Sequence, residues 1–404
     1  MRRSSVRTQR PDRIRVLYSF PHKIGSGRIC YTAWHQVAGA SAAGADMLVH
    51  PGVVHRSLPA PVRVQPTLAR GRWRIPYRAL GRLNAFALHD RIVARRLTRM
   101  ADEVDVVHAW PLGALETLRA ARRLGIPTVL ERPNAYTRFA YEVVRRESER
   151  IGVELPPDHE HAYNEGILHK EEEEYRLADY LLCPSEFTAK TFLDAGYPPG
   201  KLVRHIYGFD DDKFYPAPER RDEPQLTMIF VGVAAVRKGL HFALEAWLRS
   251  PASEKGTFLI AGQMLPAYEA KLAEMLAHPS VKALGHRDDV PDLMRASDLF
   301  VLPTIEEGFG LVCTEALACG AVPLVSEACT ELCVHEENAL VHSIGDVDAL
   351  TEHITRLHDD RALLSRLREA GLRTAPTITW AKAGERLVDV YRSVAQAERE
   401  RLSA

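Results

Sequence analysis

Short runs of apolar residues alternate along the chain with longer amphipathic stretches. In chain order, the runs are IRVLYSF, ADMLVH, VDVVHAW, PTVLE, YLLCPS, TMIFVGV, GTFLIAG, SVKALG, LFVLPT and AVPLVS. Strand-length runs separated by helix-length segments are typical of βαβ units and parallel sheets. The pattern stops between Lys201 and Glu223, where Gly, Pro and charged residues follow one another without an apolar period. We therefore predict two doubly wound α/β domains, with a boundary in this segment.

Length and composition agree with this division. The chain has 404 residues, which suits two domains of about 150 to 200 residues better than one. The polar, Arg-rich start of the chain lacks any periodicity, so we expect residues 1–13 to form a disordered tail. The first domain is expected over residues 14–204.

Charge and cysteine content exclude several classes of protein. The net charge is zero, with 53 basic and 53 acidic residues, so no global field attracts nucleic acid. No run approaches the roughly 18 apolar residues of a membrane span. The 6 cysteines form no CxxC pair and lie mostly within apolar segments, which favours reduced thiols. We expect a cytoplasmic protein.

Two local charge clusters depart from the overall neutrality. Residues 61–100 contain ten arginines and one acid, Asp90, and apolar residues within this stretch recur at helical spacing. Such a basic amphipathic segment can lie on an anionic membrane at the inner face, while the alternative is an arginine-rich helix packed on its domain. The acidic run Glu171–Glu174 is expected to be the solvated face of a helix rather than a metal site.

The most informative motif is PTIEEGFGLVCTEALACGAVPLV, residues 303–325. It follows the apolar run LFVLP, and its Gly308 and Gly310 predict a turn before a helix over 311–319. Open α/β sheets bind ligands at this edge, and the N–H groups at a helix start favour an anion such as a diphosphate. Glu307 and Glu315 are eight positions apart, so they can address different parts of one extended ligand, where carboxylates accept hydrogen bonds from sugar hydroxyls.

This E-x7-E motif with its internal GFG resembles the signature of the retaining glycosyltransferases of family four, the group 1 enzymes with the two-domain GT-B fold. Further segments are similar to those of the family. They are the glycine loop Gly25-Ser26-Gly27, the domain opening HIYGFDDDKFYP at 205–216, FVGVAAVRKGLHFALEAW at 230–247, and the terminal helix TWAKAGERLVDVYRSV at 379–394.

The resemblance implies a fold and an activity. It implies two Rossmann-like domains facing a cleft, the second over 205–378 binding a nucleotide diphosphate sugar, and a helix over 379–404 returning to the first. The enzyme would transfer the sugar with retention to an acceptor that is a glycan, a lipid-linked molecule or a small molecule. Arg237 and Lys238 would hold the donor diphosphate in place of a metal, so no cofactor is expected.

The resemblance also implies roles for the residues of the motif. Glu315 would bind the ribose, and Glu307 would bind sugar hydroxyls and orient the ring. The remaining donor-binding positions would be Gly25, Gly27, Gly308, Phe309, Gly310, Leu311 and Val312.

On the acceptor side we expect His108, Asn134 and Tyr136. The family often has a His where this chain has Tyr136, and Tyr is a weak base near neutral pH. The family's double glycine is replaced by residues around 328–330. For His108 the alternative is a core histidine. For the whole chain the alternatives are a GT-B isomerase or phosphorylase, and a catalytically lapsed protein that binds a nucleotide sugar or a membrane.

Overall fold

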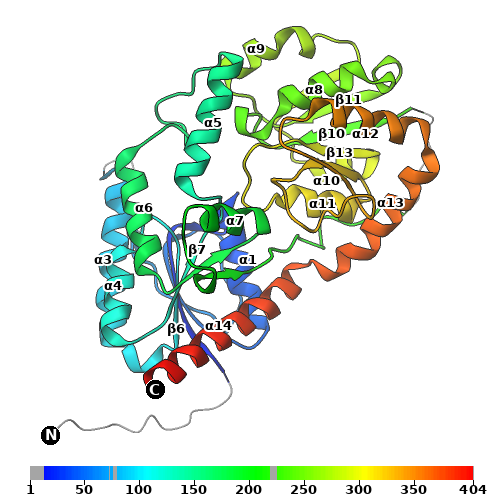
Figure 1. The fold of residues 1–404 in the computed structure, drawn as a ribbon. Coiled ribbons are helices and arrows are strands. Elements are labelled where there is room, and N and C mark those ends of the chain that lie inside the picture. Colours follow the sequence, from blue (N-terminus) through cyan, green and yellow to red (C-terminus); the bar gives the residue numbers. More distant parts are fainter. Residues whose placement is uncertain (1–12, 72, 76–79, 219–224, 404) are drawn as a thin grey trace, which may run out of the picture. The chain divides into compact units, whose positions relative to one another are not determined.

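The computed structural model describes residues 13–71, 73–75, 80–218 and 225–403 (Figure 1). The tail predicted over residues 1–13 thus lies outside the described residues, apart from Arg13. Two parallel sheets contain most of the strands, which confirms the predicted pair of Rossmann-like sheets.

The first sheet has the strand order β3-β2-β1-β6-β7-β8-β9. Its strands are β1 (Arg15–Ile24), β2 (Asp46–Val54), β3 (Arg63–Val64), β6 (Val106–Ala109), β7 (Thr128–Glu131), β8 (Tyr180–Cys183) and β9 (Leu202–Arg204). The helices along this part of the chain are α1 (Ile29–Ala42), α3 (Arg82–Arg99), α4 (Leu115–Leu124), α5 (Thr137–Ile151), α6 (Glu165–Leu177) and α7 (Glu186–Asp194). A short antiparallel pair joins β4 (Ala69–Arg70) to β5 (Trp73–Arg74).

The second sheet has the strand order β12-β11-β10-β13-β14-β15. Its strands are β10 (Thr227–Val231), β11 (Thr257–Ala261), β12 (Val281–Gly285), β13 (Leu299–Leu302), β14 (Val322–Ser326) and β15 (Leu340–His342). Its helices are α8 (Leu240–Arg249), α9 (Pro266–Leu276), α10 (Val290–Ala296), α11 (Leu311–Cys319), α12 (Val347–Asp359) and α13 (Arg361–Thr374). Each pair of neighbouring strands in this order is parallel, and the order reverses between β10 and β13.

Burial follows from the sequence of these strands. β13 and β14 are buried at every position, as expected for strands covered by helices on both faces. Helices α8 and α12 contact each other, as α11 does α10 and α13, so each face of the sheet is covered by its own layer (Figure 1). The aspartates Asp346 and Asp360 cap α12 and α13 through their side chains, satisfying N–H groups that have no partner within the helix.

Contacts divide the chain into two compact units. One unit runs to Leu130 and includes Leu177–Asp179 and the chain from Gly384 onward; the other contains Glu131–Arg176 and Tyr180–Ala383. The sheets divide the chain elsewhere, between Arg204 and Thr227, so the predicted domains over 14–204 and 205–378 stay predictions.

The last helix, α14 (Trp380–Ser403), packs on the first unit, which confirms the predicted return of the chain. Gly384 lies against Gly39 of α1 so closely that a side chain at position 384 would meet the Gly39 backbone at 2.3 Å. The Tyr391 hydroxyl lies 2.7 Å from Nδ1 of His108 in β6.

The basic segment 61–100 forms the β4–β5 pair and helix α3; Arg72 and Arg78 of this stretch lie outside the described residues. The apolar positions of α3 are mostly buried, Phe86, Val93 and Leu97 completely, so this face of the helix is not available to a membrane. Among the helices of the described residues, none is long and apolar enough to cross a membrane.

Candidate active site

The candidate site lies where the order of the second sheet reverses. The loop after β10 forms a short 3-10 helix, η3 (Val236–Lys238), and the loop after β13 holds residues 303–310 before α11. Strands β10 and β13 are neighbours, so the two loops begin side by side at the carboxyl edge. Ligands of open α/β sheets bind at such a switch point. The structure thus brings together Arg237, Lys238 and Glu307, which the sequence placed in different motifs.

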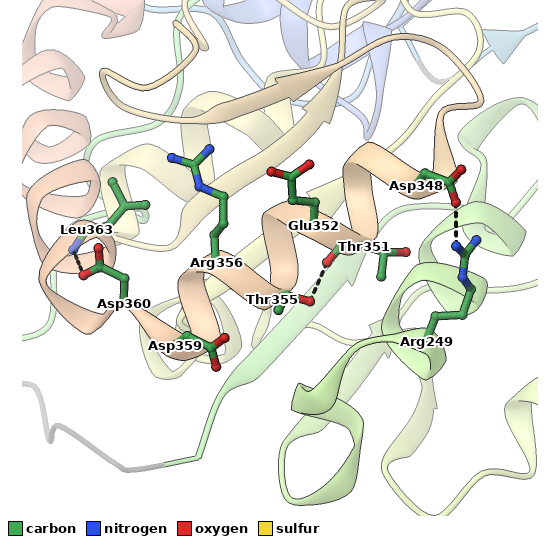
Figure 2. Close-up of a pocket in the computed structure, with 9 residues that line it drawn as sticks. All are labelled: Arg249, Asp348, Thr351, Glu352, Thr355, Arg356, Asp359, Asp360 and Leu363. Atoms are coloured by element: carbon green, nitrogen blue, oxygen red, sulfur yellow. Dashed lines mark hydrogen bonds and ion pairs between the residues drawn. The ribbon is translucent and has the colours of Figure 1, made fainter.

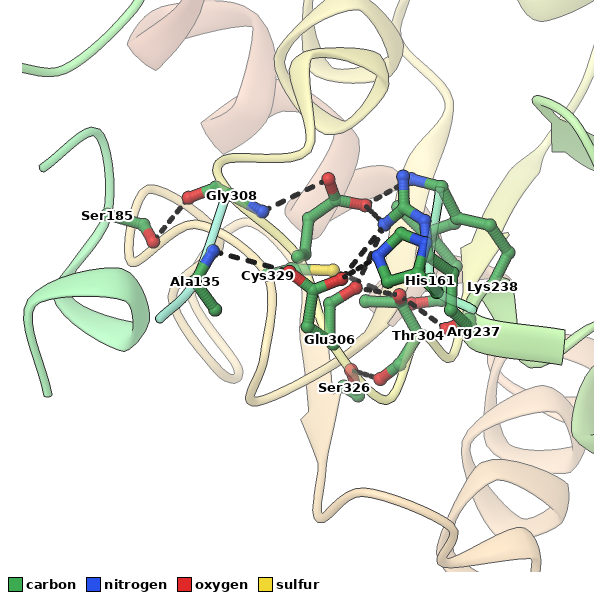
Figure 3. Close-up of polar contacts among 12 residues, drawn as sticks. Ala135, His161, Ser185, Arg237, Lys238, Thr304, Glu306, Gly308, Ser326 and Cys329 are labelled. Carbon is green, nitrogen blue, oxygen red and sulfur yellow. Dashed lines mark hydrogen bonds and ion pairs between the residues drawn. The ribbon is translucent and has the colours of Figure 1, made fainter. Parts of the chain in front are cut away.

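The side chains of these loops form ion pairs. The Lys238 ammonium contacts Oε2 of Glu307, and Nη1 of Arg237 lies 3.6 Å from the same oxygen (Figure 3). Burial alone would raise the pKa of Glu307, but the positive charges of Lys238 and Arg237 outweigh burial and lower it. Glu307 is therefore ionised, and without a ligand each cation is already paired.

Sequence reasoning missed Glu306, which is fully buried. Its carboxylate lies 3.5 Å from Nη1 of Arg237 and 3.3 Å from Nε2 of His161, and it accepts a hydrogen bond from the Ala135 N–H at 3.3 Å (Figure 3). Burial would raise the pKa of Glu306, but the hydrogen bond from His161 and the charge of Arg237 lower it to about 2. A second buried carboxylate thus joins the loop after β13 to two segments distant in sequence.

Two glycines allow backbone segments to meet here. A side chain at Gly308 would lie 1.7 Å from the Pro133 carbonyl oxygen, and one at Gly239 would lie 2.0 Å from that of Pro303. Gly239 also has a φ of 67°, which favours glycine. The Gly308 carbonyl accepts hydrogen bonds from the hydroxyls of Ser185 and Thr188. The loop is thus fixed through its backbone.

Helix α11 begins next to these carboxylates. Gly310 is its N-cap, with a φ of 77°, and Leu311 and Val312 in its first turn are half-buried. The first N–H groups of a helix have no acceptor within it, so they suit an anion. Phe309 differs from this set, because its ring is buried against Tyr207 and Trp380. Its role in donor binding stays a prediction, and its ring is part of the core.

Glu315 lies in the second turn of α11 and is half-buried. Burial, with a smaller effect of the nearby Asp210 carboxylate, raises the pKa of Glu315 to about 7. The described residues give it no hydrogen bond and no ion pair within 4.0 Å, although the charges of Asp210 and Lys213 act on it. A half-buried carboxyl group in this position suits a ligand that brings its own hydroxyl groups.

The predicted acceptor residues Asn134 and Tyr136 follow β7. Asn134 is exposed. The Tyr136 hydroxyl donates a hydrogen bond to Glu172 at 2.6 Å, and burial together with this hydrogen bond raises the pKa of Tyr136. The phenolate form, which is the form that could act as a base, is therefore even less populated near neutral pH than in a free tyrosine. Its role toward an acceptor stays a prediction.

The acidic run on α6 is not the solvated face that the sequence suggested. Glu171 and Glu174 are buried, and Glu171 pairs with the buried Arg132 at 3.2 Å. Arg132 also stacks over the Tyr175 ring, with its guanidinium carbon 4.3 Å from the ring centroid. This part of the prediction is wrong because a buried arginine, 39 positions away, neutralises the carboxylate.

Gly25, Gly27 and His108 lie in the first unit, and their functional roles stay predictions. Gly25 has a φ of 81°, and a side chain there would meet Cβ of Arg56 at 2.5 Å, whereas one at Gly27 would meet nothing within 4 Å. The His108 ring is fully buried, packs against Tyr18 with centroids 4.5 Å apart, and contacts Tyr391. This is the environment expected for the core-histidine alternative.

Residues 328–330, where the family's double glycine is replaced, lie next to a cavity of about 200 Å³. Its lining includes Ser326, Cys329 and Cys333, and Ser326 and Cys329 appear beside the ion pairs in Figure 3. A larger cavity of about 590 Å³ lies along α12 and Arg249, and its lining shares no residue with the ion-paired loops (Figure 2). Over the described residues, no group of three or more His, Cys, Asp or Glu side chains is arranged to hold a metal.

Comparison with known proteins points to one family. Residues 225–360 match the family model described as "Glycosyl transferases group 1". The chain is 29% identical over 241 residues to a lipopolysaccharide core biosynthesis mannosyltransferase, LpsB, of Rhizobium meliloti, which covers 54% of this chain and 67% of the relative. It is 24% identical over 311 residues to an Escherichia coli UDP-Gal:alpha-D-GlcNAc-diphosphoundecaprenol alpha-1,3-galactosyltransferase, covering 72% and 76%. For two further curated relatives the match spans 54% and 45% of their length.

Solved structures show the same fold over nearly the whole chain. Sucrose-phosphate synthase from Thermosynechococcus elongatus superposes with a TM-score of 0.71 at 18% identity, covering 96% of this chain and 100% of that one. HepE of Anabaena in complex with UDP-glucose superposes with a TM-score of 0.65 at 17% identity, covering 94% and 100%. At this identity the likeness concerns the fold.

Proposed function

We propose that the chain is a group 1 glycosyltransferase that transfers a sugar from a nucleoside diphosphate donor, with retention, to a lipid-linked or glycan acceptor. The match of residues 225–360 to this family and the two-sheet fold shared with solved structures support the proposal. The observation that supports this most is the meeting of Arg237 and Lys238 with Glu307 at the switch point of the second sheet. Two cations beside the start of a helix form an anion site at the edge where such sheets bind nucleotides.

The charges of this site suit cleavage of a glycosyl diphosphate. As the bond breaks, negative charge grows on the leaving diphosphate, and the cations Arg237 and Lys238 stabilise it more in the transition state than in the ground state. Glu307 accepts hydrogen bonds from the sugar and Glu315 from the ribose. The two cations take the place of a divalent metal, so we propose that the reaction needs none.

The donor and acceptor classes come from the relatives. HepE was crystallised with UDP-glucose, and LpsB is named as a mannosyltransferase. Two relatives, with 24% and 25% identity, are named for acceptors attached to diphospho-undecaprenol, a lipid. We propose a UDP- or GDP-activated hexose as donor and a lipid-linked glycan as acceptor.

A lipid-linked acceptor fits exposed apolar and basic residues of the first unit. Trp73 is 85% exposed and Leu83 39%, and exposed arginines, Arg74 and Arg82, lie beside them in the sequence. Tryptophan and arginine together suit the interface of an anionic membrane. We propose that these exposed residues, rather than the buried face of α3, touch the membrane at its periphery.

Hydrolysis of the donor tests the enzyme proposal. Without acceptor, the protein should slowly release free sugar from UDP-glucose or GDP-mannose, and proton NMR should detect the anomer of the donor first. Glu307→Gln should lower the rate by at least tenfold, while Glu254→Gln, an exposed glutamate of the same unit, should not. Binding of donor with no release would favour a lapsed protein, and early release of the opposite anomer would exclude retention.

Vesicle sedimentation tests the membrane proposal. Binding to vesicles with anionic lipid should exceed binding to neutral ones and decrease with salt, because each Arg near the surface contributes on the order of 1 kcal/mol. Trp73→Ala and Arg82→Gln should weaken binding; Tyr215→Ala, an exposed aromatic residue of the other unit, should not. Equal binding to both kinds of vesicle would contradict the proposal.

A further inference from the structure

Both cations of the candidate site, Arg237 and Lys238, are paired with carboxylates of the same site. Arg237 lies within 3.6 Å of both Glu306 and Glu307, and Lys238 contacts Glu307. The two positive charges and the two negative charges give this cluster a net charge of zero. A donor that brings the negative charges of a diphosphate must therefore share these cations with Glu306 and Glu307, and the added charge meets a carboxylate that is fully buried.

His161 also contacts Glu306, and its imidazole can carry a positive charge when protonated. Its ring is 4% exposed, and Nε2 lies 3.3 Å from Oε2 of Glu306. In the part of the chain that is described, Nδ1 is buried and has no hydrogen-bond partner; the nearest carboxylate oxygen, Oε1 of Glu160, lies 3.8 Å away. Nε2 thus contacts Glu306, while Nδ1 is available for a proton and faces Glu160.

Resting on the proposed function, we propose that His161 takes up a proton from the buffer when the donor's diphosphate binds, and so acts as a positioning residue that holds Glu306 while Arg237 turns to the phosphate. The proton binds Nδ1, and the Nε2–H continues to donate to Glu306. The imidazolium then replaces the positive charge that Arg237 withdraws. Histidine suits this role because its charge changes near neutral pH.

Other charged groups face His161 or titrate in the same site. Arg237 in η3 shares the Glu306 carboxylate with the ring, and carboxylate oxygens of Glu306 and Glu160 lie 3.3 and 3.8 Å from its two nitrogens. His159 lies in the same loop, with its ring centroid 5.7 Å from that of His161. Glu315, whose pKa is raised to about 7, should lose a proton on binding a ribose. The test must therefore compare variants rather than use the wild type alone.

Calorimetry of nucleotide-sugar binding provides this comparison. UDP-glucose and GDP-mannose are suitable probes, because a diphosphate diester does not titrate near neutral pH. Heats measured at pH 7 in MOPS and in Tris, which differ in ionisation enthalpy, give the number of protons taken up. We expect the wild type to take up about half a proton more than His161→Gln, and its affinity to fall by up to about tenfold more than that of the variant between pH 6 and pH 8.5.

Two further variants sharpen the result. Glu306→Gln removes the negative charge that His161 balances. This variant should therefore take up no more protons on donor binding than His161→Gln does. His286→Gln, an exposed histidine of the same unit, should keep the wild-type uptake. Binding with the same uptake in wild type and His161→Gln would overturn this inference and leave the proposed function standing. A wild type that binds none of the nucleotide sugars would overturn both.

Discussion

The two sheets reverse their strand order in the same way, yet the two reversals differ in chemistry. In the second sheet the loops after β10 and β13 bring Arg237, Lys238 and two glutamates together as buried ion pairs. In the first sheet the order reverses between β1 and β6, where Gly25 follows one strand and His108 lies in the other. There the His108 ring packs against Tyr18, and Arg56 stacks on Trp34 with its guanidinium carbon 3.8 Å from the ring centroid.

The topology of a sheet thus determines where a site can form, and the loop residues determine its chemistry. A parallel sheet with this order provides a crevice whatever its sequence. In the second crevice, an incoming anion would disturb the ion pairs of Arg237 and Lys238 with Glu306 and Glu307.

The largest effect is expected from the loop glycines. Gly308→Ala places Cβ 1.7 Å from the Pro133 carbonyl oxygen, so the loop must move, and we expect a loss of about 3 kcal/mol in stability and more than a hundredfold in turnover. Gly27→Ala, in the loop after β1 of the first sheet, meets nothing within 4 Å and should change stability by less than about 0.5 kcal/mol. Chemical denaturation and donor hydrolysis measure both. Similar values for the two variants would break the comparison.

The next effect concerns the arginines. Arg237→Ala should lower kcat/KM by about ten- to a hundredfold, because a charged hydrogen bond to the diphosphate contributes roughly 1.5–3 kcal/mol. Arg56→Ala, in the first region, should change kcat/KM less than threefold. Steady-state kinetics on folded variants decide the matter. Unchanged kinetics in Arg237→Ala would contradict the assignment of the donor diphosphate to this loop.

Glu315→Gln should separate stability from binding. An acid whose folded pKa is raised binds its proton more tightly when folded, so its contribution to stability is lost as pH rises from about 4.5 to about 7. Relative to the wild type, Glu315→Gln should be equally stable at pH 4 and more stable by about 1–3 kcal/mol at pH 8. The same variant should bind donor more weakly. Equal thermal unfolding of both proteins at pH 8 would contradict this prediction.

The smallest effect is expected from His108→Phe, which keeps a ring but removes the contact with the Tyr391 hydroxyl. Leaving a buried hydroxyl without this contact should lower stability by about 1–2 kcal/mol. The KM for acceptor, measured on the folded variant, distinguishes the two roles of His108. An unchanged KM favours the core histidine, and a KM raised tenfold or more would place His108 on the acceptor side.

The strands and the two charged loops were predictable because apolar runs mark strands and because the carboxyl ends of neighbouring parallel strands meet. Glu306 and His161 were not. Glu306 and Glu307 are adjacent glutamates, so the sequence does not show which of them is buried or what each contacts. His161 lies 145 positions before Glu306, in a segment without apolar periodicity. The pairing of Arg132 with Glu171 was missed for a related reason, since charged residues are expected at the surface until a partner is known.

The return of α14 also determines when the first unit can form during synthesis. Tyr391 and its buried neighbours Leu387 and Val388 belong to this unit, although they are made last. Domains usually fold in the order in which the ribosome releases them. Here the strands up to Leu130 must wait roughly tens of seconds, at ordinary elongation rates, for the helix that completes their core. The second unit lies mostly after Leu130, yet all its residues up to Ala383 are synthesised before the first unit receives its helix.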